Sequence, residues 1–307
     1  MLFVLFNSQA LAIEVMVSIK PLHSLTATIM SGVGEPQLIV DGAVSPHHFQ
    51  LKPSHIRDLN RSDLVIYIDP RFEHFLVNSL KTIPSKVSQL RLTSKLSLPL
   101  LERRSHRDWE KRGEGHHHEH NQPKIHGHHH DHNDEFPDFH FWLDPKYAIN
   151  VAKEITAQLS LLDPDNIAIY KKNYSRLVTA LDGLNQDLTA QLDGLQNRHF
   201  VVLHDAYQYF ESAYKLSSVG TVLLDPALPP SASQMKYIRE RMNAAKVVCV
   251  FQEPQYSKRV IQTVTENLPV KISQIDPIGA GIPSGEAHYF SLMKSLSKAV
   301  ADCLKAQ

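Results

Sequence analysis

The sequence has only two cysteines among its 307 residues, which excludes both a disulfide-rich scaffold and a zinc site built from several thiolates. An excess of one charge is also missing, because 32 lysines and arginines balance 32 aspartates and glutamates. A neutral chain argues against nucleic acid or an anionic membrane as an electrostatic partner. Beyond the first residues, no stretch reaches the roughly 18 apolar residues that a membrane-spanning helix needs. These absences leave a water-soluble chain that is long enough for two modest domains.

The two cysteines, Cys249 and Cys303, are available to each other. In an exported protein such a pair predicts one disulfide bridge, whereas two free buried thiols are the alternative. The bridge would close a loop of about 55 residues and would stabilise the fold by about 4 kcal/mol through chain entropy.

The first twelve residues, MLFVLFNSQALA, form a short apolar run that ends in an Ala-x-Ala pattern. This ending is typical of a secretory signal cleaved after Ala12, although the basic residues that usually precede the apolar part are missing. A buried strand is the alternative, but three polar residues, at 7–9, interrupt the run. We interpret residues 1–12 as the remnant of a signal. No nearby cysteine offers a site for a lipid, so we expect a mature protein without a membrane anchor.

Residues 102–135 hold ten of the nineteen histidines. Trp109 and Ile125 are the only large apolar residues in this segment, so it cannot bury a core and is predicted to be a mobile, solvated loop. A solubilising insert is one alternative interpretation. A vector tag is another, but the internal position of the segment argues against it. Imidazole is the commonest protein ligand for zinc-like metals, so we favour metal capture. The candidate weak ligands are His116, His117, His118, His120, His126, His128, His129, His130 and His132.

Short apolar runs alternate with helical stretches along the remaining chain. The runs are nearly continuous, as in parallel strands that are buried on both faces. The predicted strands cover 15–19, 37–40, 63–68, a weaker run near 87, and then 200–203, 217–219, 247–251 and 270–275. The pattern predicts an α/β fold whose second half repeats the first.

Apolar residues recur every three or four positions from Tyr170 to Leu195. This periodicity predicts a helix of about thirty residues, roughly 45 Å long. A coiled-coil dimer is one interpretation, but a brace between two α/β halves is simpler. We therefore expect an N-terminal lobe over 13–162 that contains the histidine-rich loop, a connecting helix within 163–197, and a C-terminal lobe over 198–307.

Several polar side chains fall at the predicted carboxyl ends of strands, where ligands bind in open parallel sheets. Each one alone has an ordinary explanation as a capping or solvated residue. Three histidines that converge between two lobes, with an oxygen ligand or water, would instead form a tetrahedral zinc site. Spacing alone does not choose between the two adjacent histidines at 47 and 48. The candidates are His47, His48, His140, His204, Glu253 and Asp276.

An ordered set of motifs makes a resemblance specific. Taken together, and with an acidic histidine-rich loop before the second candidate ligand, they resemble the ZnuA family, the periplasmic zinc-binding components of zinc ABC importers. The resemblance covers essentially the whole mature chain. The motifs are SIKPL at 18–22, SPHHF at 45–49, FHFWLDP at 139–145, HDAYQYF at 204–210, FQEPQ at 251–255 and IDPIG at 275–279.

The resemblance implies a cluster A-I solute-binding protein. Its expected fold is two Rossmann-like lobes with parallel sheets, joined by a long rigid helix, with a metal site in the interlobe cleft. The implied zinc ligands are His47, His140 and His204. Manganese and iron relatives have a carboxylate in place of His204, so this histidine favours zinc. The family's cysteine pair corresponds to Cys249 and Cys303.

The fourth ligand stays open. Some members of the family have a glutamate directly before the first ligand histidine, but this chain has Pro46 there. Water is our first choice, Asp276 the second, and a histidine of the loop the third.

The implied function is high-affinity capture of Zn²⁺ in the periplasm of a Gram-negative bacterium. A soluble monomer would deliver the ion to an ABC permease in the inner membrane, without chemical turnover. A zinc buffer or metallochaperone that works through the histidine-rich loop is the first alternative. A zinc hydrolase with Glu253 or Asp276 as base is the second, but the sequence has no HExxH-type motif.

Overall fold

The computed structural model describes residues 13–104 and 136–305. The predicted signal remnant, the nine candidate loop histidines and all of 105–135 therefore lie outside the described residues. Within the described ranges the strands form two sheets of four, in the orders β2-β1-β3-β4 and β6-β5-β7-β8. Every strand pair in both sheets is parallel. The two sheets thus share one topology, as the repeated sequence pattern predicted.

The N-terminal lobe contains β1 (Val15–Val17), α1 (Lys20–Met30), β2 (Gln37–Leu38), η1 (Pro46–His48), α2 (Pro53–Arg61), β3 (Leu64–Tyr67), η2 (His74–Leu76), α3 (Val77–Thr82), β4 (Ser88–Arg91) and η3 (Leu92–Ser94). After the undescribed segment come η4 (Phe141–Leu143), α5 (Pro145–Leu162), η5 (Pro164–Asn166) and α6 (Ile167–Leu192). The C-terminal lobe contains β5 (Phe200–His204), α7 (Gln208–Tyr214), β6 (Ser218–Leu223), α8 (Ala232–Ala244), β7 (Cys249–Gln252), α9 (Lys258–Thr265), β8 (Lys271–Gln274) and α10 (His288–Lys305).

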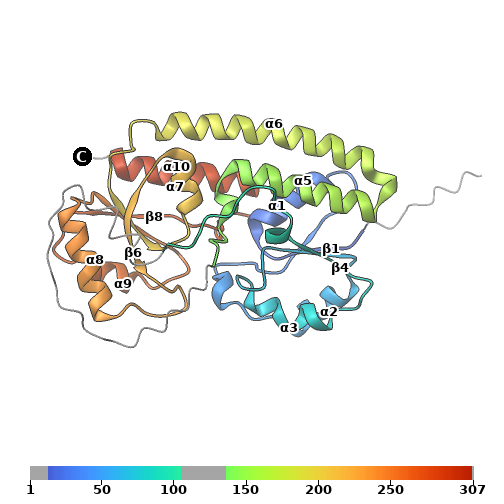
Figure 1. Cartoon of the computed structure of the whole chain (residues 1–307), viewed down its shortest axis with the longest axis horizontal. Helices are drawn as coiled ribbons and strands as arrows, with labels where there is room; N and C mark the ends of the chain where they lie inside the picture. Colours follow the sequence, from blue (N-terminus) through green and yellow to red (C-terminus); the bar gives the residue numbers. More distant parts are fainter. Residues whose placement is uncertain (1–12, 105–135, 306–307) are drawn as a thin grey trace, which may run out of the picture.

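This architecture confirms the predicted α/β class with two lobes (Figure 1). The inner strands β1, β3 and β5 are buried along their whole length, and β7 is buried except at Gln252, because helices cover both faces of each sheet. The edge strands β2, β4 and β8 are partly exposed, and Ile272 of β8 is 45% exposed. The predicted domain boundaries, after residues 162 and 197, both fall between elements of secondary structure, and they stay a prediction.

Helix α6 runs along both lobes and packs against α1, α5 and α10 (Figure 1). Its buried face carries the predicted leucines, and the side-chain amide of Asn173 donates to the carbonyls of Ile29 at 3.0 Å and Ser31 at 2.8 Å. The helix has 26 residues, so the prediction that it continues to Leu195 was wrong. It ends at Leu192 because Asp193 is extended and Gly194 has a φ of +78°.

One hydrophobic core extends through both lobes instead of stopping at the boundary between them. Buried hydrogen bonds reinforce this junction. The Trp142 indole donates to the carbonyl of Pro277 at 2.7 Å, and the Tyr289 hydroxyl donates to the carbonyl of Trp142 at 2.7 Å. Lys20, from the SIKPL motif, donates to the carbonyl of Ala280 at 3.0 Å. Separating the lobes would break these bonds and expose apolar surface, so the junction resists large opening.

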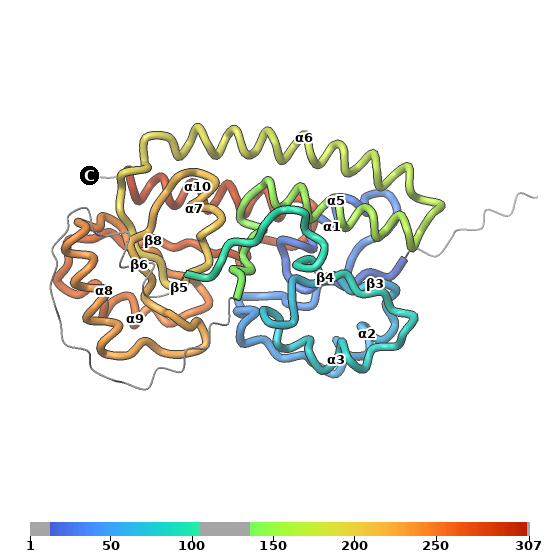
Figure 2. Tube along the Cα trace, in the orientation of Figure 1, coloured from blue at the N-terminus to red at the C-terminus, as the bar shows by residue number. Residues whose placement is uncertain are grey.

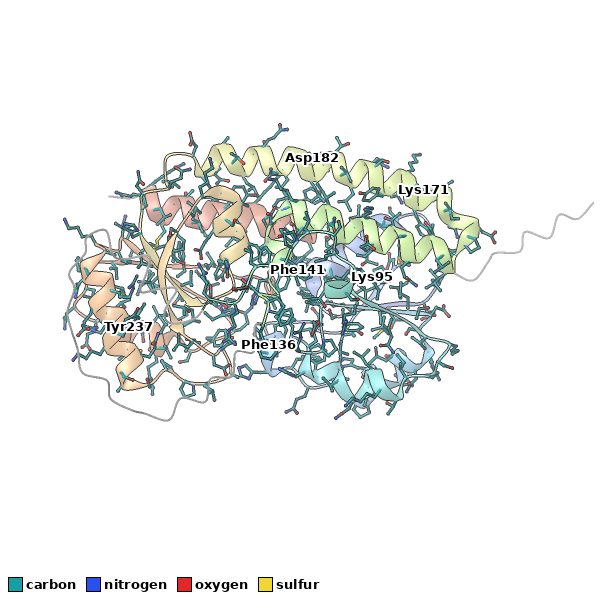
Figure 3. All side chains as sticks on the ribbon, viewed as in Figure 1. Lys95, Phe136, Phe141, Lys171, Asp182 and Tyr237 are labelled. Atoms are coloured by element: carbon teal, nitrogen blue, oxygen red, sulfur yellow. A yellow bond between two sulfur atoms is a disulfide. The ribbon has the colours of Figure 1, made fainter. Side chains whose placement is uncertain are left out.

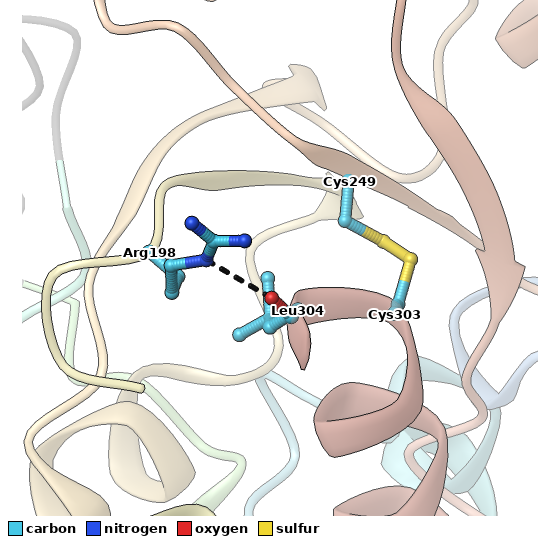
Figure 4. The surroundings of a disulfide bond; sticks show 4 residues. All are labelled: Arg198, Cys249, Cys303 and Leu304. Carbon is cyan, nitrogen blue, oxygen red and sulfur yellow. Dashed lines mark hydrogen bonds between the residues drawn. A yellow bond between two sulfur atoms is a disulfide. The ribbon is translucent and has the colours of Figure 1, made fainter. Parts of the chain in front are cut away.

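The predicted disulfide is confirmed: Cys249 on β7 is bonded to Cys303 near the end of α10 (Figure 4). The Cα atoms lie 6.0 Å apart. Beside the bridge, the Arg198 guanidinium donates to the carbonyl of Leu304 at 3.0 Å. The last helix is therefore held both covalently and by a hydrogen bond against the C-terminal sheet. Among the described residues, no helix combines the length and apolarity needed to cross a membrane.

Candidate metal centre

His204 is the last residue of β5, and Glu253 directly follows β7. Strands β5 and β7 are neighbours in the sheet although two helices and another strand separate them in the chain. This is the point where the strand order reverses, and ligands of open α/β sheets bind at the carboxyl ends there. The topology thus brings His204 and Glu253 together, and the Glu253 carboxylate accepts a hydrogen bond from His204 Nδ1 at 2.7 Å.

His47 lies in η1, the short helix that follows β2 in the N-terminal lobe. The Ser45 hydroxyl accepts a hydrogen bond from the His47 backbone N–H at 3.3 Å, and Pro46 occupies the first helical position. This cap fixes the turn. The imidazole packs against the ring of Phe72, with 5.0 Å between the ring centroids.

His140 directly precedes η4, and the sequence Asp138-Phe139-His140 forms a local clamp. The Asp138 carboxylate accepts from both the backbone N–H of His140 at 2.9 Å and its Nδ1 at 2.8 Å. Trp142 lies behind the imidazole, with 5.2 Å between the ring centroids. Figure 3 places the neighbouring Phe141 in the middle of the molecule, where it is fully buried. This short segment therefore fixes the position of the second histidine between the lobes.

The structure brings His47, His140 and His204 together. One ring nitrogen from each lies within 4.8 Å of the others. The ring centroids are 5.9 Å apart for His47 and His140, 5.7 Å for His47 and His204, and 5.5 Å for His140 and His204. In 13–104 and 136–305, no other group of three or more such ligand side chains comes this close. The arrangement is that of three facial ligands around one ion.

The hydrogen bonds also determine which nitrogens face the centre. A carboxylate oxygen only accepts, so the Nδ1 atoms of His140 and His204 carry protons, and in the neutral imidazole that binds a metal the lone pair is on Nε2. His204 Nε2 is buried and has no hydrogen-bond partner among the described residues. A buried acceptor without a partner costs free energy, and a bound cation would satisfy it. The donor set therefore fits zinc.

The neighbouring charges act in opposite directions on the pKa values of His204 and His47. Burial alone would lower the pKa of His204, but the Glu253 carboxylate outweighs it and the net pKa is raised. For His47, burial lowers the pKa well below its usual value, and repulsion by His204 and His140 acts in the same direction. His47 is therefore the more readily available as a neutral ligand.

The three histidines border a cleft of about 380 Å³ between the lobes. The cleft is much larger than one metal ion. A metal ion held by the three histidines would therefore have a fourth coordination position that faces the open cleft. Its other lining residues are Arg71, Phe72, His74, Arg103, Phe136, Pro137, Asp138, Phe139, Asp205, Leu224, Asp225, Pro226 and Ala227.

The remaining predicted residues have other contacts. His48 is exposed, and its Nε2 hydrogen-bonds to the carbonyl of Pro226 at 3.0 Å. The two carboxylate oxygens of Asp276 accept from the Gln255 amide at 2.8 Å, from Ile278 N–H at 3.0 Å and from Ala280 N–H at 2.7 Å. The loop histidines lie outside the described residues. Sequence analysis missed the role of Asp138, although its position two residues before His140 was a local signal.

The chain is similar in sequence to a known protein family. The family described as "Zinc-uptake complex component A periplasmic" matches residues 15–303. The chain is 32% identical to the high-affinity zinc uptake system protein ZnuA of Brucella abortus, over 94% of this chain and 91% of that protein. It is 33% identical to the protein of the same name from Yersinia pestis, over 95% and 91% respectively.

A solved structure of a ZnuA deletion mutant with zinc bound has the same fold, with a TM-score of 0.76 at 23% identity. The match covers 96% of this chain and 99% of the chain in that structure. The family match and the two relatives extend over nearly the whole sequence. The chain belongs to the ZnuA family of periplasmic zinc-uptake components.

Proposed function

We propose that this chain captures Zn²⁺ in the periplasm and delivers it to the permease of a zinc ABC importer. The observation that carries the proposal is the approach of three imidazoles to within 4.8 Å of one another, in a cleft that both lobes border. Their family context supports uptake as the purpose of the site. Zinc is the transported ion, and His47, His140 and His204 are its proposed ligands.

Water is the proposed fourth ligand. Asp276 is not among the ligand side chains that lie within 4.8 Å of one another, and both of its oxygens accept hydrogen bonds from Gln255 or backbone amides. The cleft beside the histidines has room for water. Three nitrogens and one water match the tetrahedral preference of zinc, and no further protein ligand is needed.

The hydrogen bonds of the two candidate bases, Glu253 and Asp276, support a protein that carries the ion without chemical turnover. A zinc hydrolase needs a base that can reach the metal-bound water. Of the two candidate bases, Glu253 is paired with His204 Nδ1 and Asp276 with Gln255 and backbone amides. Both carboxylates are thus engaged in holding the fold. We propose that the protein is no enzyme.

Delivery requires the zinc affinity of the site to fall, but the junction between the lobes resists large opening. We therefore propose that docking of the monomer on the permease disturbs the ligands locally, at the border of the cleft. The histidine-rich segment would hold further zinc weakly and raise its concentration near the cleft.

Zinc affinity is expected to fall as the pH drops from 8 to 5. Zinc binds neutral imidazole, so each proton that must leave the site reduces the affinity about tenfold per pH unit below that group's pKa. The pKa of His204 is raised, so the decline starts with this residue. His47, whose pKa is lowered well below its usual value, takes up a proton only at a lower pH than His204. Competition titrations against a chelator at several pH values measure this.

Glu253→Gln is the matched variant for the pH series. Removing the carboxylate that raises the pKa of His204 should move the start of the decline to lower pH. At pH 8 the variant should bind zinc about 10- to 100-fold more weakly, because the partner of a metal-bound imidazole orients it. An affinity that stays constant between pH 8 and 5 would contradict histidine ligation.

Transport itself is tested in the host. Cells that lack the gene should stop growing in medium with a zinc chelator and recover when zinc is added. The wild-type gene should restore growth, whereas a His47→Ala/His140→Ala/His204→Ala gene should not, at equal protein levels. Growth supported equally by the triple variant would refute transport through the cleft. If the wild type had a hydrolytic activity that His204→Ala abolished, the alternative function as a zinc hydrolase would be favoured.

A further inference from the structure

One carboxylate on the cleft, that of Asp205, could serve as a fourth metal ligand but is not among the converging ligand atoms. Asp205 follows His204 in the chain and lines the same cleft as the three imidazoles. Nevertheless, no oxygen of Asp205 belongs to the group of ligand atoms that lie within 4.8 Å of one another. A residue adjacent to a metal ligand, on the same cleft, needs a physical reason to stay out of the coordination sphere.

The reason is the guanidinium of Arg104. Its Nε donates to both carboxylate oxygens of Asp205, at 3.0 and 2.9 Å, and its Nη2 donates to Asp205 Oδ1 as well. The same side chain donates to the two oxygens of Glu211, at 2.8 Å from Nη1 and 3.0 Å from Nη2. Only 4% of the Arg104 side chain is exposed. Bidentate pairs of this kind are strong and orient both partners.

Both ends of this cluster are anchored. Glu211 accepts further hydrogen bonds from the Ser218 N–H at 3.1 Å and from its hydroxyl at 2.8 Å. The segment that carries Arg104 crosses from the N-terminal lobe and ends beside β5 (Figure 2). Along it, Leu101 N–H donates to the Tyr209 hydroxyl at 2.9 Å, and Arg103 donates to the carbonyl of Leu224 at 2.6 Å. The contacts of Leu101 and Arg103 thus hold the residues directly before Arg104 against the C-terminal lobe, where its guanidinium meets Asp205.

We infer that Arg104 determines metal specificity, because it holds the Asp205 carboxylate away from the metal and keeps the centre rich in nitrogen. The inference rests on the proposed function, in which the three histidines bind zinc. Imidazole suits zinc, whereas carboxylate and water suit manganese. If Asp205 were released, its side chain would supply an anionic oxygen next to His204. The site would then accept manganese better relative to zinc.

The decisive variant is Arg104→Gln/Glu211→Gln. In the wild type one guanidinium faces two carboxylates, which gives a formal charge of −1, and in the double variant Asp205 alone gives −1. The total charge is therefore unchanged while Asp205 is released. The control adds Asp205→Asn to the same two substitutions. Zinc and manganese dissociation constants are measured by competition titration, and Co²⁺ absorption spectra report the coordination geometry.

The double variant should lower the preference for zinc over manganese by at least about tenfold, and the Co²⁺ bands should weaken as coordination rises above four. The triple variant should restore both values. A folded double variant with the wild-type preference and spectrum would overturn the inference. A wild-type protein without a tight zinc site would overturn the proposed function instead.

If circular dichroism shows that the double variant does not fold, Arg104→Lys decides. Lysine keeps the positive charge but cannot form the fork, so Asp205 would gain freedom without an unpaired buried charge. The expected result is a smaller fall in the zinc preference, at least about threefold, that Asp205→Asn reverses in the same background. An unchanged preference in this variant would overturn the inference.

Discussion

Replacing His204 with alanine is expected to weaken zinc binding by more than about a hundredfold. Losing only the hydrogen-bond partner of a metal-bound histidine costs about 10- to 100-fold, so losing the ligand itself should cost more. His204 contributes a buried Nε2 that has no other partner among the described residues. Calorimetry in competition with a chelator measures the change, and His47→Ala and His140→Ala should behave alike.

His48→Ala is the matched control for His47→Ala. The two histidines are adjacent, but His48 is exposed and hydrogen-bonds to the carbonyl of Pro226, outside the group of three. Its replacement should change the zinc affinity by no more than about twofold. Equal losses in the two variants would mean that the cleft does not distinguish these residues, and the ligand assignment would be wrong.

The strands could be predicted because parallel strands buried on both faces appear as apolar runs. The errors have local causes. The run at 37–40 was predicted as one strand, but β2 ends at Leu38, although Ile39 and Val40 still donate to the carbonyls of Val17 and Ser18, both at 2.9 Å. Strand β6 was predicted to be shorter than it is, because Gly220 and Thr221 interrupt its apolar pattern.

Gly220 shows why such an interruption misleads. A side chain at this position would collide with Ile238 of α8, so the glycine lets the helix approach the strand closely. Gly220 interrupts the apolar pattern of the strand, but its lack of a side chain leaves room for Ile238 to pack there. A pattern of apolar residues alone does not contain this information.

The site was predictable to the extent that it depends on topology. His204 and Glu253 lie at strand ends, and the parallel order of β5 and β7 makes them neighbours. The choice of His47 over His48 required the family motif, because it depends on how η1 turns. The pairing of Arg104 with Asp205 joins residues 101 positions apart, and no local pattern predicts it.

The histidine-rich segment can be removed with little disturbance, because its ends lie side by side. Arg103 N–H donates to the carbonyl of Phe136 at 3.0 Å, and Asp138 N–H donates to the carbonyl of Leu101 at 2.7 Å. Glu102 and Pro137 form an antiparallel bridge between these bonds. A Gly-Gly linker can therefore connect Arg104 to Phe136 in place of residues 105–135, and it leaves the described contacts of both ends intact.

This deletion should remove every weak zinc equivalent and leave the tight one. The nine histidines from His116 to His132 are lost, whereas His47, His140 and His204 and their carboxylate partners remain. Calorimetric zinc titration should show one site whose affinity is within about twofold of the wild type. Adding the three alanine substitutions to the deletion should abolish binding altogether. If the deletion alone abolished the tight site, the segment would be the functional zinc-binding part, and the protein would act as a buffer, because the cleft histidines would be insufficient without it.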